Sequence, residues 1–126
     1  MTDSAAIVRE FWRLMASNDF ESVGVLLAPD FVLEWPQSNE RIRGASRFAQ
    51  MNAEYPAHGR WAFTVHRVVG GESEAVSDTS VSDGVQSGRA LSFFSLRGGL
   101  ISRIVEYWPE PYPAPMNRSH LVEPIE

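Results

Sequence analysis

Hydrophobic residues recur at helical spacing along the first part of the chain, after a residue suited to cap a helix. Asp3 or Ser4 provides the cap, and the apolar positions that follow are Ile7, Val8, Phe11, Trp12, Leu14 and Met15. This spacing predicts a first helix that ends near residues 17–19. A second, short helix is expected over residues 20–27, and Pro29-Asp30 ends it before a strand over residues 31–35.

A third helix is predicted in the middle of the chain. Residues 36–40 have the composition of a loop, and Gly44 marks a turn before the helix begins. The helix is expected over residues 45–55, with Phe48, Met51 and Tyr55 on its inward face because they recur at helical spacing.

The pattern changes after residue 60, where strand-like segments alternate with turns that contain glycine. Strands are expected over residues 61–69, 74–82, 87–96 and 101–108, with turns at Gly70-Gly71, Asp83-Gly84 and Gly98-Gly99. Turns this short join antiparallel strands, so the pattern predicts a four-strand meander. Residues 109–126 contain five prolines and cannot form a regular helix or an interior strand. We therefore expect one domain over residues 1–126, with an extended, Pro-rich tail over residues 109–126.

Composition excludes several kinds of function. The chain has 126 residues, enough for one domain with its own core, and it lacks cysteine, which excludes disulfides, thiolate chemistry and iron–sulfur clusters. Its net charge of −5 opposes binding to a phosphate backbone, so no nucleic-acid partner is expected. No window approaches membrane-spanning length and the N-terminus lacks the pattern of a secretion signal, so the prediction is no membrane contact and a cytoplasmic location.

Several segments carry a resemblance to a known family. They are the break at residues 18–20, the entry into the first strand at residues 26–31, the Arg43-Gly44 step, residues 94–101 and the segment at residues 106–111. With the order of elements, these resemble the SnoaL-like proteins of the nuclear transport factor 2-like superfamily, which includes ketosteroid isomerases and polyketide cyclases. The resemblance implies an α+β fold of cystatin-like type, with a cone-shaped, curved, antiparallel or mixed sheet wrapped around three N-terminal helices.

The resemblance also shows which catalytic groups this chain lacks. Ketosteroid isomerases carry a base, an oxyanion-hole tyrosine and an oxyanion-hole aspartate at positions that correspond here to Trp35, Phe11 and, approximately, Ser92. Steroid isomerisation by that mechanism is therefore not expected. Since the superfamily includes isomerases, cyclases, dehydratases, epoxide hydrolases and simple binding proteins, the resemblance implies no single reaction.

The register that the resemblance implies predicts the lining of the cone. It directs Asp78, Ser80 and Ser82 inward from one strand, Ser92 and Phe94 from the next, and Glu106 and Trp108 from the last. Trp12, Trp35 and Phe48 are expected to close the space. The resulting pocket is aromatic and apolar, which suits a small hydrophobic or aromatic molecule. For each tryptophan taken alone, core packing is the competing interpretation.

Glu106 and Asp78 are the predicted catalytic groups. Aromatic neighbours would remove water from Glu106 and raise its pKa, so that it exchanges a proton near neutral pH, while Asp78 shares the proton or holds a water. The competing interpretation pairs Glu106 with Arg43 or Arg103 and leaves Asp78 in water. His66 is expected to be structural, because no second histidine stands at ligand spacing, and neither a metal nor a cofactor is predicted.

The outward sheet face is predicted to be unusually apolar. It carries Thr79, Val81, Leu91, Phe93, Val105 and Tyr107, which favours a homodimer through this face. The tail either crosses that interface or folds back on its own domain.

Three functions remain open at this point. They are a cofactor-independent enzyme acting by proton transfer, a non-catalytic binding module, and an interaction domain.

Overall fold

The computed structural model describes residues 3–126, which form two α-helices, two 3-10 helices and six strands. In chain order the elements are α1 (Ser4–Ala16), η1 (Phe20–Leu26), β1 (Leu27–Trp35), β2 (Glu40–Arg43), α2 (Ala45–Glu54), β3 (Ala62–Gly70), β4 (Glu74–Ser82), β5 (Ser87–Arg97), β6 (Leu100–Tyr107) and η2 (Met116–Arg118). The predicted α+β class is confirmed, with a curved mixed sheet and three helices before the meander, which are α1, η1 and α2.

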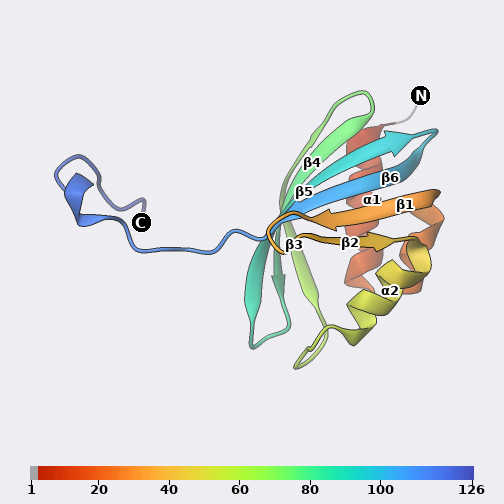
Figure 1. Cartoon of the computed structure of the whole chain (residues 1–126), viewed down its shortest axis with the longest axis horizontal. Coiled ribbons are helices and arrows are strands. Elements are labelled where there is room, and N and C mark those ends of the chain that lie inside the picture. The colour runs from red at the N-terminus through yellow and green to blue at the C-terminus, as the bar shows by residue number, and fades with distance from the viewer. Residues whose placement is uncertain (1–2) are drawn as a thin grey trace.

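All six strands belong to one sheet, in the order β2-β1-β6-β5-β4-β3. Strands β3 to β6 form the predicted antiparallel meander, and β1 pairs in parallel with β6. Figure 1 shows α1 crossing one face of this curved sheet, with α2 beside β1 and β2. The helices therefore cover the inner face, while no helix within residues 3–126 lies over the other face.

Helix α1 supplies much of the core because its apolar residues fall on one face. Asp3 caps the helix by accepting a hydrogen bond from the Ala6 amide at 3.2 Å. The buried apolar residues of α1 pack against aromatic and aliphatic side chains from β1, α2, β5 and β6. This core contains Val8, Phe11, Trp12, Met15, Phe31, Leu33, Phe48, Phe94, Ile101 and Ile104.

The region around the first strand differs from the prediction. Strand β1 begins at Leu27 rather than at residue 31, and its pairing with β6 is irregular between Leu27 and Val32, so Pro29 is accommodated there. Strand β2 was not predicted. It has four residues and pairs as an edge strand with β1, with Ile42 opposite Leu33. A strand this short, with one apolar residue, gives no alternating pattern.

The inward face of β4 was predicted wrongly. The buried residues are Ala75, Ser77, Thr79 and Val81, whereas Asp78, Ser80 and Ser82 alternate with them and point to the outer face. Strand pairing fixes this arrangement, because Ser77 lies opposite Ser92, which is also buried. Thr79 and Val81 therefore do not belong to the outer face.

A buried carboxylate joins two loops at one end of the sheet. Asp83 accepts hydrogen bonds from the backbone amides of His58, Val85 and Gln86 at 2.8–2.9 Å. Although burial opposes its ionisation, the donors of Gln86, His58 and Val85 outweigh it and hold the pKa of Asp83 far below its usual range. The ionised side chain thus connects the loop before β3 to the β4–β5 hairpin.

Replacing Asp83 with Ala is expected to lower the melting temperature by roughly 5–10 °C at pH 7, because three backbone amides lose their acceptor. Since the pKa is lowered by folding, this stabilisation is present above the ordinary Asp pKa of about 3.9 and is lost as the pH falls below it. Thermal unfolding of both proteins between pH 7 and pH 3 tests this. Asp19→Ala, which removes an exposed carboxylate, is the control. An equal loss for both variants would contradict the assignment.

Candidate functional site

Glu106 lies on the inner face of the sheet with two neutral donors at its carboxylate. The β5–β6 register sets Ser92 opposite Glu106, and the Ser92 hydroxyl donates to Oε2 at 2.7 Å. From the end of β1, the Trp35 indole Nε1 donates to Oε1 at 3.0 Å. Glu106 is only 7% exposed. The predicted inward direction of Ser92, Phe94 and Glu106 is confirmed.

Burial governs the protonation of this carboxyl group. Loss of hydration raises the pKa of Glu106, and the donors Ser92 and Trp35, together with the nearby Trp108 side chain, only partly oppose that rise. Its pairing with Arg43 or Arg103, the competing interpretation, is wrong. The Arg103 guanidinium instead donates to Glu34, which also accepts from Arg41 on the outer face. Glu106 is therefore a buried acid surrounded by neutral groups.

Asp78 does not join Glu106. It points to the outer face and forms two hydrogen bonds with Arg89, one of them from Nη2 to Oδ2 at 2.7 Å. Arg89 is the largest cause that lowers the pKa of Asp78, so this carboxylate stays ionised. The prediction that Asp78 faces the cone with Glu106 is wrong, because Ala75, Ser77, Thr79 and Val81 occupy the inner face of β4.

Ser80 and Ser82 also lie outside the cone. The Ser80 hydroxyl lies 2.6 Å from His66 Nε2 on the outer face, and the Ser82 hydroxyl accepts from the Gly84 amide at 3.0 Å. Their predicted place in the pocket lining is wrong for the same reason of register. Both hydroxyls have local partners, and His66 takes part in a hydrogen bond as expected.

The aromatic residues nearest α1 fill the interior of the cone. The Phe11 ring lies 5.0 Å from Trp12, 6.0 Å from Phe48 and 5.3 Å from Phe94, measured between ring centroids. The Trp12 indole donates to the Ser77 hydroxyl at 3.0 Å. These side chains are packed as core, and a role for Trp12, Phe48 or Phe94 in binding a ligand stays a prediction.

Trp108 stands beside β5, immediately after the end of β6. A Cβ atom at Gly88 would lie 3.4 Å from the Trp108 ring, so the ring lies against the backbone of β5 at this glycine. Trp108 and Trp35 are both half-buried. Together they flank Glu106, while the three side chains around Phe11 lie deeper in the core.

Thr79 was missed by the sequence analysis. Its side chain is fully buried on the inner face, and Oγ1 has no hydrogen-bond partner, which is true of no other buried side-chain oxygen or nitrogen in residues 3–126. A buried hydroxyl without a partner costs free energy unless a ligand or water meets it. Ser77 lies opposite the buried Ser92, and Thr79 shares the face of Ser77, so this pairing would have placed Thr79 inside. The alternation of side chains along β4 does not reveal the pairing.

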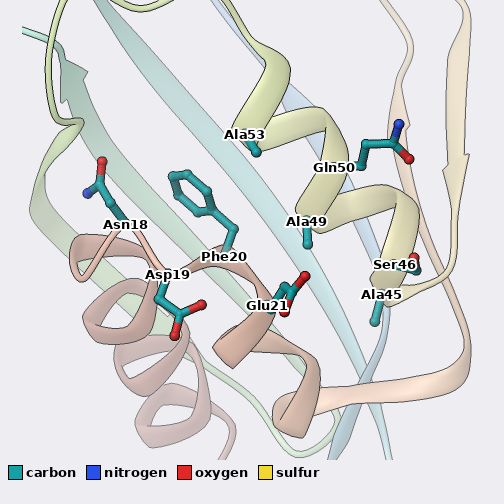
Figure 2. A pocket seen from close by; sticks show the side chains of 9 residues that line it. All are labelled: Asn18, Asp19, Phe20, Glu21, Ala45, Ser46, Ala49, Gln50 and Ala53. Carbon is teal, nitrogen blue, oxygen red and sulfur yellow. The ribbon is translucent and has the colours of Figure 1, made fainter.

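A surface groove lies elsewhere, between η1 and α2. Figure 2 shows the residues around this space of about 640 Å³, which are Asn18, Asp19, Phe20, Glu21, Ala45, Ser46, Ala49, Gln50 and Ala53. None of the predicted site residues lines it. The groove is therefore distinct from the aromatic pocket that was expected beside Glu106.

Two further findings bear on the predicted chemistry. Over residues 3–126, no three His, Asp or Glu side chains gather closely enough to hold a metal ion. No helix in that same range is long and apolar enough to cross a membrane. Independence from cofactors and a cytoplasmic location stay predictions.

Comparisons with known proteins agree on the architecture. The sequence profile of the SnoaL-like domain matches residues 8–104. A crystal structure of a candidate ketosteroid isomerase from Kribbella flavida DSM 17836 is similar, with 33% identity over 97% of this chain and 89% of that one, and a TM-score of 0.88. An NTF-2-like protein of unknown function from Burkholderia xenovorans LB400 shares 25% identity, covering 96% and 94% of the two chains, with a TM-score of 0.80.

A more distant similarity extends to an epoxide hydrolase. The structure of an LEH-like epoxide hydrolase from M. tuberculosis has 20% identity over 83% of this chain and 81% of that one, with a TM-score of 0.67. This likeness concerns the fold alone. No curated protein sequence matches the chain.

Proposed function

This chain belongs to the SnoaL-like family, and from that premise we propose that it binds a small, uncharged, largely apolar molecule beside Glu106 and transfers a proton to or from it. The observation that carries the proposal is a buried carboxyl group whose hydrogen-bond partners, Trp35 and Ser92, are both neutral. Asp78, by contrast, is paired with the Arg89 cation on the outer face, where the Asp78 side chain is 21% exposed.

The surroundings of Glu106 favour a neutral ligand over a charged one. An anion would meet the carboxylate without any cation to balance the two charges. Trp35 and Trp108 offer apolar surface for a flat molecule, and the free hydroxyl of Thr79 offers a hydrogen bond deeper on the inner face. A molecule with one or two polar atoms on an apolar frame suits these groups.

Glu106 can act in either direction, because burial raises its pKa and so favours the protonated acid, while the ionised form is a poorly hydrated base. When protonated, it donates to a carbonyl or epoxide oxygen; when ionised, it removes a proton from carbon or from water. Ser92 and Trp35 hold the two carboxylate oxygens in place during the transfer.

The proposal is tested with 5-nitrobenzisoxazole, a neutral bicyclic probe for a desolvated carboxylate base. The base removes the carbon-bound proton of the isoxazole ring, and the electron pair of that C–H bond forms the third C–N bond of a nitrile. The N–O bond breaks, and its electron pair leaves on the oxygen as a coloured phenolate. Wild-type protein is expected to exceed Glu106→Gln by at least about tenfold in kcat/KM, with a rate that rises with pH as Glu106 ionises.

Asp78→Asn is the matched control, since it removes a carboxylate from the opposite face of the same sheet. Its rate should equal that of the wild type. Equal rates for wild type and Glu106→Gln would overturn the role of Glu106 in proton transfer.

A non-catalytic binding module is the second candidate. The observation in its favour is that Trp35, Phe11 and Ser92 replace the catalytic groups of ketosteroid isomerases. This candidate is supported if the probe binds, as measured by quenching of tryptophan fluorescence, and Glu106→Gln changes neither binding nor turnover.

The outer sheet face supports a proposed homodimer. Leu91, Phe93, Val105 and Tyr107 lie together on β5 and β6, where Phe93 is 45% exposed and packs edge-on against Tyr107. The charges bordering them are already paired, as in Asp78–Arg89 and Glu34–Arg103, which lowers the cost of covering this face. A second copy of the chain, related by a two-fold axis, would bury these apolar residues against its own.

A further inference from the structure

The C-terminal tail, residues 109–126, leaves the domain in a fixed direction. The Trp108 amide donates to Gln37 Oε1 at 2.6 Å, and Gln37 Nε2 donates to the Trp108 carbonyl at 3.3 Å. These two bonds hold the backbone at the point where β6 has ended. Figure 1 shows the tail running away from the sheet, with the C-terminus far from both helices.

The first part of the tail is a stiff spacer. Proline occupies every second position from 109 to 115, so each φ angle of proline is fixed and each intervening residue is held extended. A polyproline-type segment of seven residues spans roughly 20 Å and does not fold back on itself. The chain beyond it is therefore kept away from its own domain.

The far part of the tail carries four large apolar side chains that are exposed in the single chain. Met116 is 83% exposed, Leu121 76% and Ile125 102%, and Val122 is also exposed. The short helix η2 and the hydrogen bond from the Leu121 amide to the Arg118 carbonyl give this part a local fold. Four exposed aliphatic side chains on a structured segment indicate a surface that is covered in the working protein.

We propose that the tail is an exchanged arm, in which residues 116–125 of each copy dock on the second copy of the chain. This inference rests on the proposed homodimer. Tyr107 lies on the outer sheet face and is followed directly by Trp108 and the spacer, so a tail that leaves there starts at the border of the sheet interface and continues over the partner. Because the spacer is stiff and extended, residues 116–125 can reach a second copy of the chain but cannot fold back onto their own domain.

The experiment compares dimer dissociation constants by sedimentation equilibrium. The tail variant carries Met116→Ser, Leu121→Ser, Val122→Ser and Ile125→Ser, and it should weaken the dimer by at least about tenfold. Val25→Ser and Val85→Ser remove apolar side chains that are 74% and 73% exposed elsewhere, and this double variant should leave the constant unchanged. An unchanged constant for the tail variant would overturn the exchanged arm.

A Phe93→Asp variant separates the arm from the sheet interface. If Phe93→Asp dissociates the dimer and the tail variant does not, the sheet interface is supported and the exchanged arm is wrong. If the tail variant dissociates the dimer and Phe93→Asp does not, the exchanged arm is supported and the sheet interface is wrong. A monomeric wild-type chain overturns both.

Amide hydrogen exchange gives a second readout, since protection of residues 116–125 must decrease on dilution. Protection that is independent of concentration would mean that the tail folds on its own domain, which also overturns the arm.

Discussion

Replacing Phe11 with Ala is expected to lower the free energy of unfolding by about 3–5 kcal/mol, measured by urea denaturation. Phe11 is 2% exposed and its ring contacts Trp12, Phe48 and Phe94, which come from two helices and a strand. Truncation leaves a cavity among these rings, and a packed core does not collapse to fill it. Phe11 thus accounts for much of the contact between the helices and the sheet.

The Phe11 variant also tests how the interior of the cone is used. Because the new cavity is lined by aromatic rings, it should stay dry and take up toluene, which would restore part of the lost stability. Val25→Ala, at a residue that is 74% exposed, is the control and should change stability by less than about 0.5 kcal/mol. A loss below about 1 kcal/mol for Phe11→Ala would mean that the interior is open rather than packed.

The architecture was predictable because its signals are local. Helical spacing marked α1 and α2 to within a residue or two, and the glycine turns marked the four strands of the meander. Strand β2 gives no such signal, because a four-residue edge strand needs only one inward apolar residue, and that residue is Ile42. Its existence depends on pairing with β1, which no local pattern encodes.

The site was predictable only in part, and β4 shows why. Val76 and Val81 are five residues apart and must point to opposite faces, while serine, threonine and aspartate fill the positions between them. Either face could therefore have been the inner one. On β6 the buried residues Ile104 and Glu106 alternate with exposed ones, so Glu106 was placed correctly, whereas Asp78 was assigned to the cone and Thr79 to the outside.

The protonation of Glu106 should be visible in how stability depends on pH. Burial raises the pKa of Glu106 in the folded state above its ordinary value of about 4.3. The stabilisation linked to this proton is therefore fully present below pH 4.3 and is lost as the pH rises through the raised pKa. Glu106→Gln cannot ionise, so in urea denaturation its stability relative to the wild type should increase as the pH rises above about 4.3 and should level off once the pH has passed the raised pKa of Glu106.

Two further variants give this result its meaning. Glu34→Gln removes a carboxylate whose pKa is lowered by Arg41 and Arg103, so its effect on stability must have the opposite sign, costing stability above the ordinary Glu pKa and little below it. Glu106→Ala leaves the Trp35 and Ser92 donors without an acceptor and should cost about 1–3 kcal/mol at pH 4, where Glu106→Gln costs little.

If Glu106→Gln instead follows Glu34→Gln, the pKa of Glu106 is lowered by folding rather than raised, and its place among neutral donors is structural. If Glu106→Gln follows the expected course, the folded protein contains an acid, Glu106, whose ionisation lowers the stability of the fold. That result would support the proposed proton transfer by Glu106, because a carboxyl group that burial holds in its protonated form is suited to exchanging a proton with a ligand.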